Sequence, residues 1–295
     1  MIGPLPGPPS VTLRCHGKLN LFLEVLEKRP DGFHEIESIL TPAPMVEDEL
    51  TASIAPYPGI SLAVEGGKRW GVPEDRTNLA WRAAELVLAE SKASAGVDLR
   101  LRKGIPPGAG LGGGSSDGAA ALRAVNRLLG SPLGPERIAA LALSLGSDVP
   151  YFLEGGTVLA RGRGEILERL PSPPPLPCWV QWPGIPCSTA EVYARCRPAG
   201  SGRRSSADIV AALSAGDPRA IDAACFNRLE EAAAAVCPAV GRTLDLLRRM
   251  GGGRAHLSGS GSACFRLVHE DPEAAAARDW PFHLPPGVFC EERGG

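Results

Sequence analysis

The sequence lacks several features that would assign it to whole classes of protein. Its formal net charge is only −2, so nothing predicts a basic track for nucleic acid. No apolar run approaches the roughly 20 residues of a membrane-spanning helix. The N-terminus shows neither the charged nor the apolar region of a signal peptide. We therefore expect a cytoplasmic protein that binds small molecules, with no nucleic acid and no membrane among its partners.

The cysteines and histidines lack the spacing of metal sites. Eight cysteines are scattered through the chain without a C-x-x-C pair, and the five histidines show no ligand spacing. Several cysteines lie among apolar neighbours, as at Cys225 and Cys264. Buried, reduced thiols are therefore expected rather than a zinc site or a disulfide framework, and no protein residue is predicted to bind a metal.

Glycine, in contrast, is concentrated just before a helical pattern. Gly-Ala-Gly-Leu-Gly-Gly-Gly-Ser-Ser-Asp occupies residues 108–117, and apolar residues then recur at helical spacing as far as Leu128. Ser115, Ser116 and Asp117 are the candidate N-caps of this helix. Glycines let the backbone approach a ligand closely, and the N–H groups at a helix start attract anions. The stretch predicts a phosphate-binding loop rather than a flexible linker.

Two better-known phosphate loops do not fit this stretch. Residues 108–113 satisfy the dinucleotide pattern G-x-G-x-x-G. That interpretation requires a second strand ending in an acidic residue, whereas the helix ends near Gly130 and another helix starts at Pro135. The chain also contains no G-x-x-x-x-G-K-[ST] sequence, so it has no P-loop.

The rest of the chain predicts a mixture of strands and helices in about two domains. Strand patterns occupy 11–15, 19–26, 49–55, 60–64, 97–102, 156–160, 165–170, 254–257, 262–268 and 286–291. One helical pattern begins after Thr77 or Asp75 as its N-cap. Further helical patterns occupy 135–145, 188–197, 206–215, 227–236 and 238–250. Residues 29–34 predict a hairpin turn. The prolines of 171–177 predict a stiff connector, which divides the chain into domains at 1–170 and 171–295.

Three polar stretches are ambiguous on sequence alone. Lys18 and Asn20 share one face of a strand, and exposure to solvent is the default interpretation. Asp148 follows a helix-terminating glycine, which is typical of a turn or cap residue. Residues 257–262, Leu-Ser-Gly-Ser-Gly-Ser, lie between two predicted strands, so a hairpin and a ligand-facing role explain them equally well.

Several motifs resemble those of one enzyme family. Residues 106–117 resemble the phosphate loop of the GHMP small-molecule kinases, which include galactokinase, homoserine kinase and mevalonate kinase. Residues 257–262 are similar to that family's C-terminal glycine motif. Residues 18–23, 28–34, 146–150 and 226–231 are similar to the members that act on a cytidine diphosphate alcohol. The matches run from residue 18 to beyond 260 in the expected order.

This resemblance implies a fold and a reaction. The fold would be the two-domain α+β GHMP kinase fold, with a ribosomal-protein-S5-like N-terminal domain and a ferredoxin-like C-terminal domain. The reaction would transfer the γ-phosphoryl group of ATP, accompanied by Mg²⁺, to a hydroxyl of the cytidine diphosphate alcohol. The alternatives are another GHMP kinase, of homoserine or mevalonate type, and a nucleotide-binding regulator without catalysis. We expect a monomer or a homodimer.

The resemblance also implies roles for individual residues. Asp148 would be the catalytic base and Lys18 its electrostatic partner, because a hydroxyl becomes a better nucleophile as a carboxylate takes its proton. ATP is expected at Asn78, Lys103, Pro106, Gly108, Gly110, Leu111, Gly112, Gly113, Gly114, Ser115 and Ser116. The alcohol is expected at Asn20, Phe33, His34, Thr189 and Tyr193, and the glycine motif near the active site comprises Ser258, Gly259, Ser260 and Gly261.

The chain departs from the family pattern at a few positions. His-Gly stands at 16–17, where Pro-Ala is usual, and Phe33 stands where tyrosine is usual. Gly118 replaces an alanine, a change expected to weaken the helix by up to ~1 kcal/mol. None of these departures removes a group to which we assign chemistry.

Overall fold

The computed structural model describes residues 9–173, 176–250, 253–268 and 288–289, the last two by their backbone only. The chain divides into two compact units, each assembled from separate segments. The first unit comprises Met1–His16, Glu47–Ile105 and Gly112–Glu154, and the second comprises Gly17–Val46, Pro106–Leu111 and Gly155–Gly295. Two long strands, β1 (Ser10–Lys28) and β2 (His34–Ala55), therefore have residues in both units.

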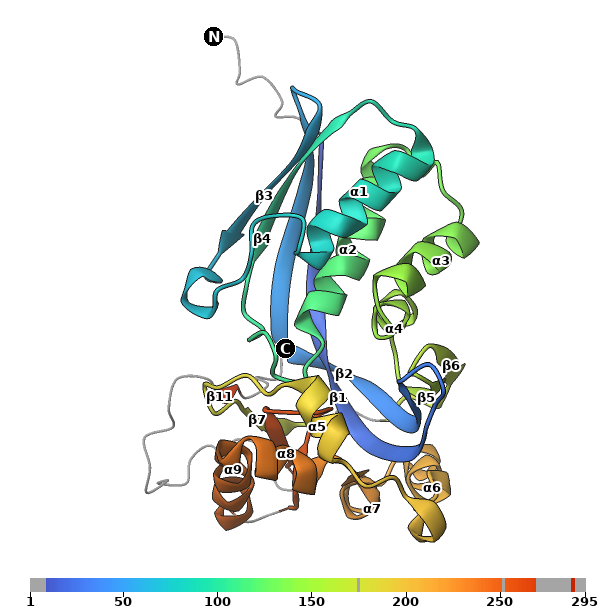
Figure 1. Ribbon diagram of the computed structural model, residues 1–295, viewed down its shortest axis with the longest axis vertical. Coiled ribbons are helices and arrows are strands. Elements are labelled where there is room, and N and C mark those ends of the chain that lie inside the picture. Colours follow the sequence, from blue (N-terminus) through green and yellow to red (C-terminus); the bar gives the residue numbers. More distant parts are fainter. Residues whose placement is uncertain (1–8, 174–175, 251–252, 269–287, 290–295) are drawn as a thin grey trace. The chain divides into compact units, whose positions relative to one another are not determined.

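The first unit is a layer of helices on a sheet. Here β3 (Gly59–Glu65) pairs in parallel with β4 (Gly96–Arg102), β4 pairs antiparallel with residues 49–55 of β2, and β1 is the next neighbour of β2. Two helices, α1 (Leu79–Ser91) and α2 (Gly113–Leu128), lie side by side against the sheet (Figure 1). They are followed by α3 (Pro135–Leu145) and α4 (Val149–Glu154), and a short 3-10 turn, η1 (Lys68–Trp70), follows β3.

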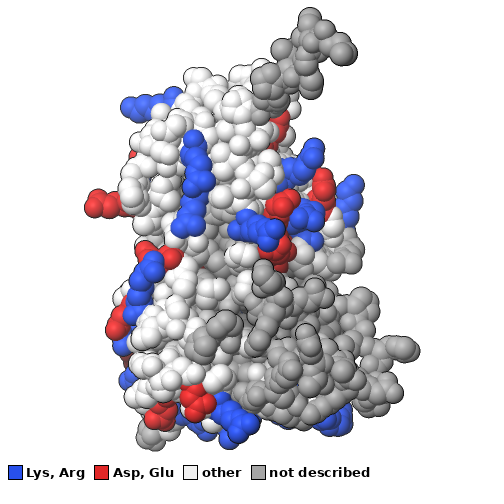
Figure 2. Space-filling model, turned by 180° about the vertical axis from the view of Figure 1, so that it is seen from behind, with Lys and Arg blue, Asp and Glu red and all other residues white. Residues whose placement is uncertain are grey.

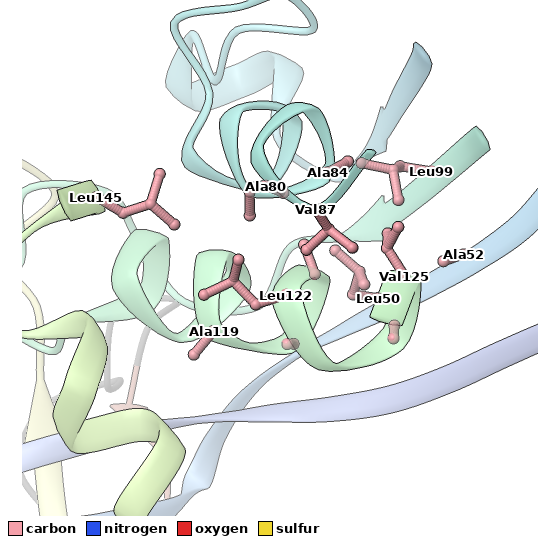
Figure 3. Packing of buried hydrophobic residues seen from close by; sticks show 14 of the residues in the cluster. Leu50, Ala52, Ala80, Ala84, Val87, Leu99, Ala119, Leu122, Val125 and Leu145 are labelled. Carbon is pink, nitrogen blue, oxygen red and sulfur yellow. The ribbon is translucent and has the colours of Figure 1, made fainter. Parts of the chain in front are cut away.

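The core of the first unit fills the space between these helices and the sheet. Val87 of α1 and Val125 of α2 point towards each other, beside Leu50 of the sheet (Figure 3). Alanines such as Ala80 and Ala84 face the same core and keep side-chain bulk between the helices low. Apolar burial of this kind supplies most of the driving force for folding.

The second unit contains two groups of strands. Residues 22–23 of β1 pair in parallel with β8 (Phe226–Asn227), and residues 36–40 of β2 pair antiparallel with β5 (Val158–Gly162), which pairs with β6 (Ile166–Arg169). A separate antiparallel sheet has the order β11 (Val288–Phe289), β7 (Cys178–Gln181), β10 (Cys264–Leu267) and β9 (Ala255–Leu257). The helical elements are α5 (Thr189–Arg195), η2 (Gly200–Gly202), α6 (Ala207–Ala215), α7 (Pro218–Ala224), α8 (Glu230–Val236) and α9 (Pro238–Arg249).

The predicted α+β class is confirmed, but several local predictions need correction. Helix α1 is capped by Asn78, whose Oδ1 accepts the N–H of Ala80, and not by Thr77 or Asp75. Helix α2 begins at Gly113 with Gly112 as its N-cap, so the candidate caps at 115–117 lie inside the helix. The pattern at 227–236 begins with the short strand β8, and α4, α7 and β7 were not predicted because each is too short for a clear period. The domain division at 170/171 stays a prediction.

Charged side chains of both signs lie on the surface, and most thiols of the described residues are buried. No helix of the described segments is long and apolar enough to cross a membrane. On the face drawn in Figure 2, the described basic and acidic side chains are interspersed. The seven cysteines among the described residues are free, and six of them are buried, as at Cys225 and Cys264. Cys290 lies outside the described residues.

Candidate active site

The side chain of Lys18 is buried on β1, and its ammonium is held by oxygen atoms. Nζ donates to Oδ1 of Asn20 and, over 2.6 Å, to the carbonyl of Gly110. The amide of Asn20 donates to Oγ of Ser38 at 2.8 Å, and that hydroxyl donates to the carbonyl of Phe22 at 2.7 Å. Lys18 and Asn20 are only 4% and 5% exposed, so the interpretation that they face solvent is wrong. An ammonium buried in this way needs such partners.

Glycine residues of two loops pack closely against this lysine in the second unit. Gly259 has a φ of +56°, and a Cβ there would lie 3.0 Å from Nζ of Lys18. Gly110 has a φ of +78°, and a Cβ there would overlap the carbonyl oxygen of Ser258. Oγ of Ser258 donates to the carbonyl of Gly110 at 3.0 Å. The turn at 258–261 joins two antiparallel strands, β9 and β10, and also contacts the glycine loop and the lysine.

A residue outside our predicted site fixes this glycine turn. The side-chain amide of Asn227 donates to the carbonyls of Leu257 and Gly259 at 2.9 and 2.8 Å. Its Oδ1 accepts the N–H of Leu229 at 2.9 Å, so both the oxygen and the nitrogen of the side chain have partners. The motif at 226–231, Phe-Asn-Arg-Leu-Glu-Glu, contains Asn227. The spacing of residues alone could not show that this side chain bonds the glycine turn.

The predicted substrate residues of the second unit form two contacts. The rings of His34 and Tyr193 lie 5.1 Å apart between centroids, and Oγ1 of Thr189 lies 2.8 Å from Oγ of Ser260. Burial and the positive charge of Lys28 lower the pKa of His34, which favours the neutral imidazole at neutral pH.

Phe33 is an exposed residue among the predicted substrate residues. It is 52% exposed, and the guanidinium carbon of Arg163 lies 4.9 Å from its ring centroid. An exposed ring face next to a cation is suited to stacking on a planar ligand.

In the first unit, the start of α2 presents backbone donors. Gly112 caps the helix with a φ of +74°, and its carbonyl accepts the N–H of Ser116 at 2.9 Å. No side chain caps the helix, so the N–H groups of its first residues are available to an anion. Leu79, next to Asn78, is close to this helix start: a Cβ on Gly114 would lie 3.9 Å from it. Both polar atoms of the Asn78 side chain are hydrogen-bonded: Oδ1 accepts the N–H of Ala80, and Nδ2 donates to the carbonyl of Pro73.

The remaining predicted site residues also lie in the first unit. Asp148 is half-buried and directly precedes α4. Because Lys18 belongs to the second unit, the predicted meeting of Lys18 and Asp148 stays a prediction. Nζ of Lys103 donates to Asp48 and, at 2.7 Å, to Asp117. Its predicted position beside adenine also stays a prediction. Among the described residues, no group of three or more His, Cys, Asp or Glu side chains could hold a metal ion.

Solved structures of two small-molecule kinases share this fold. A homoserine kinase from Cytophaga hutchinsonii is 20% identical, with a TM-score of 0.68 over 90% of this chain and 87% of that one. An L. major mevalonate kinase is 19% identical, with a TM-score of 0.72 over 98% of each chain. At these identities the likeness defines a class of fold.

More similar proteins define the family. The models for the GHMP kinases N terminal domain and the GHMP kinases C terminal domain match residues 78–156 and 209–285. A 4-diphosphocytidyl-2-C-methyl-D-erythritol kinase of Pelotomaculum thermopropionicum is 42% identical over 91% of this chain and 93% of its own. A crystal structure of a 4-(cytidine 5'-diphospho)-2C-methyl-D-erythritol kinase is 36% identical, with a TM-score of 0.73 over 90% and 96%. The chain belongs to the GHMP kinase family.

Proposed function

We propose that this chain transfers the γ-phosphoryl group of ATP to the 2-hydroxyl of 4-diphosphocytidyl-2-C-methyl-D-erythritol. The products are ADP and the 2-phosphate, within the non-mevalonate route to isopentenyl diphosphate. The observation that carries this proposal is the identity of 36–42%, over 88–91% of the chain, with relatives that bear the name of this kinase. The alternatives are another GHMP kinase, of homoserine or mevalonate type, and a regulator without catalysis.

Asp148 and Lys18 are proposed to carry the chemistry. As the 2-hydroxyl oxygen bonds to the γ-phosphorus, its proton passes to the carboxylate of Asp148, and the bond from phosphorus to the bridging oxygen of ADP breaks. The ammonium of Lys18 offsets negative charge on the transferred group. Its hydrogen bonds to Asn20 and Gly110 support this role, because they fix the direction of the charge before substrate binds.

The triphosphate is proposed to bind at 110–116, where backbone N–H groups and the start of α2 attract anions. Leu79 lies beside Gly114, which supports a place for adenine near Asn78. Mg²⁺ binds through phosphate oxygens and water with few protein ligands, so the donor set described here is compatible with Mg²⁺ entering with ATP. Bound there, Mg²⁺ supplies positive charge to the phosphates.

The cytidine end of the alcohol is proposed to lie at His34 and Tyr193, with Phe33 stacking on the base. The contact between the rings of His34 and Tyr193 supports this, since it brings an aromatic ring and an imidazole, whose nitrogens can hydrogen-bond a base edge, to one place. Asn20 and Thr189 complete the proposed pocket.

The first experiment is an ADP-release assay with Mg-ATP. The cytidine compound is offered in parallel with homoserine, mevalonate and galactose. Turnover of the cytidine compound alone is the expected result. Turnover of a different alcohol would leave a kinase with another substrate, whereas nucleotide binding without any turnover would favour the regulator.

The role of Asp148 is tested by Asp148→Asn, which keeps the size of the side chain but removes the base. We expect near-complete loss of turnover with ATP binding preserved, because proton transfer by a positioned group contributes roughly 10²–10⁴-fold. The control is Asp208→Asn, an exposed carboxylate in the first turn of α6, which should behave as the parent protein does. An active Asp148→Asn enzyme would remove Asp148 as the base.

A further inference from the structure

Three charged side chains in the first unit form a buried cluster, which we call the loop-base triad: Asp48, Lys103 and Asp117. Nζ of Lys103 donates to Oδ2 of Asp48 and to Oδ2 of Asp117, the latter at 2.7 Å. All three side chains are at most 3% exposed. An ion cluster this deeply buried carries a desolvation cost, so its geometry has to be well satisfied to persist.

The triad joins the two ends of the glycine loop. Oδ1 of Asp48 accepts the N–H groups of Gly104 and Ile105, at 2.6 and 2.8 Å, and these residues lead into the loop. Asp117 lies on α2, which begins where the loop ends. Gly113 packs tightly against the entry to the loop, since a Cβ there would lie only 2.8 Å from the Ile105 side chain. Asp48, from β2, therefore fixes the entry, and Lys103 ties that entry to the exit.

The charges of the triad do not balance if both carboxylates are ionised. Burial, together with the nearby carboxylate of Asp48, raises the pKa of Asp117 to about 8, although the ammonium of Lys103 opposes the shift. Oδ1 of Asp117 has no hydrogen-bond partner among the described residues. The other titratable group at this place is Cys15 on β1, whose pKa is raised by burial and then by Asp117 and Asp48. Asp48, Lys103 and Cys15 are thus the titratable groups around Asp117 from the neighbouring strands.

We propose that Asp48, Lys103 and Asp117 are positioning residues that close the base of the phosphate loop and so set the affinity for ATP without touching the nucleotide. This rests on the proposed function of the loop as the ATP site. A glycine-rich loop has many backbone conformations, and ordering it during binding costs free energy that a preorganised loop does not lose. Lys103 then acts through the backbone of the loop, and not as a direct neighbour of adenine.

The test compares two variants by titration with a non-hydrolysable ATP analogue, and steady-state kinetics give the KM for the alcohol. Lys103→Met keeps the length of the side chain and removes the donor that joins the two carboxyl groups. We expect the Kd for the analogue to rise by about tenfold, with the KM for the alcohol unchanged, because only the nucleotide loop loses its fixed base. If the parent protein binds no nucleotide, the proposed function fails and not the triad.

A second substitution separates positioning from direct contact. In the double variant Lys103→Met and Asp117→Asn, one carboxylate is removed and the new side-chain amide at position 117 can donate to Asp48. Most of the lost affinity should return, to within about threefold of the parent protein, because the amide at position 117 supplies a fixed donor to Asp48 in place of the ammonium. If Lys103 contacts ATP directly, the double variant stays as weak as Lys103→Met, and that result would overturn the proposal.

Asp48→Ala is the variant that decides the matter if Lys103→Met does not fold. It frees the N–H groups of Gly104 and Ile105 while Lys103 keeps its partner Asp117. The Kd for the analogue should again rise by about tenfold. Unchanged affinity in a folded Asp48→Ala protein would show that the loop needs no fixed base.

Discussion

Asn227 is one side chain on which the glycine turn beside Lys18 depends. Its amide group spans two carbonyls of the turn, at Leu257 and Gly259. Removing it leaves buried carbonyl groups unsatisfied, which costs about 1–3 kcal/mol for each group. The same loss lets Gly259 move away from the ammonium that it packs against, so stability and activity are linked at this residue.

We therefore expect Asn227→Ala to lower the free energy of unfolding by about 2 kcal/mol and kcat/KM by about tenfold or more. The matched control is Asn126→Ala, since Asn126 is a similarly buried amide that bonds the N–H and carbonyl of Leu133 in the first unit. It should lose comparable stability without the loss of activity. Chemical denaturation and steady-state kinetics on both variants give the comparison, and equal kinetic losses would make Asn227 merely structural.

Asp117 predicts a pH dependence of stability. Its pKa is raised from an unfolded value near 4 to about 8 in the folded protein, so the folded state binds the proton more tightly. Its contribution to stability is therefore complete at low pH, and decreases as the pH rises from about 4 to about 8. Asp117→Asn does not titrate. The parent protein should lose stability relative to this variant between about pH 5 and about pH 8, as measured by urea midpoints. If the difference in stability between the parent protein and Asp117→Asn does not change with pH, the raised pKa of Asp117 is contradicted.

For single residues, the sequence identifies those that lie within motifs and misses partners that are far away along the chain. Lys18, His34 and Tyr193 were named from the family resemblance, and the structure gives each of them defined neighbours. Asp117 was considered only as a helix cap, because nothing near it in the sequence indicates a buried ion pair. Its partner is Lys103, which also donates to Asp48 on β2, and this arrangement depends on how β2 meets the end of β4.

Among the elements, those bounded by proline and glycine were predicted best. Helix α3 spans Pro135–Leu145 as predicted, because Pro135 fixes its first turn and Gly146 ends it. The start of α2 was misplaced, because a glycine N-cap carries no side-chain signal. Strand β1 joins the two predicted patches 11–15 and 19–26, since burial on both faces interrupts the alternation on which the prediction relied.

Helix α2 carries a glycine that it does not need for its geometry. Gly118 is helical, and an added Cβ would lie 3.4 Å from the Cβ of Leu79, which is close to ordinary contact. Gly118→Ala should raise the free energy of unfolding by up to ~1 kcal/mol, because alanine loses less backbone freedom on folding. Gly130→Ala is the control: with a φ of +81° the same substitution should destabilise the protein. Thermal melts measure whether each variant is stabilised or destabilised. A lower melting temperature for Gly118→Ala would mean that the Leu79 side chain cannot move to accommodate the new methyl group.

The whole molecule is built from alternating segments of the chain. Each compact unit takes three segments, and the boundaries at 16/17 and 46/47 fall inside β1 and β2. Sequence patterns cannot reveal such an arrangement, because it depends on which segments pack together and not on the composition of any one of them. A linker of prolines is visible in a sequence, but a boundary inside a continuous strand leaves no local mark.

Two strands that continue through both units should make the molecule unfold as one cooperative body. Leu122 is fully buried in the core of the first unit, so Leu122→Ala should cost about 2–5 kcal/mol (Figure 3). When the strands transmit this loss, amide hydrogen exchange in β10 of the second unit accelerates together with exchange in α2. Mass spectrometry of peptides from both elements measures this. Faster exchange in α2 with unchanged exchange in β10 would instead mean that each unit opens independently, despite the strands that they share.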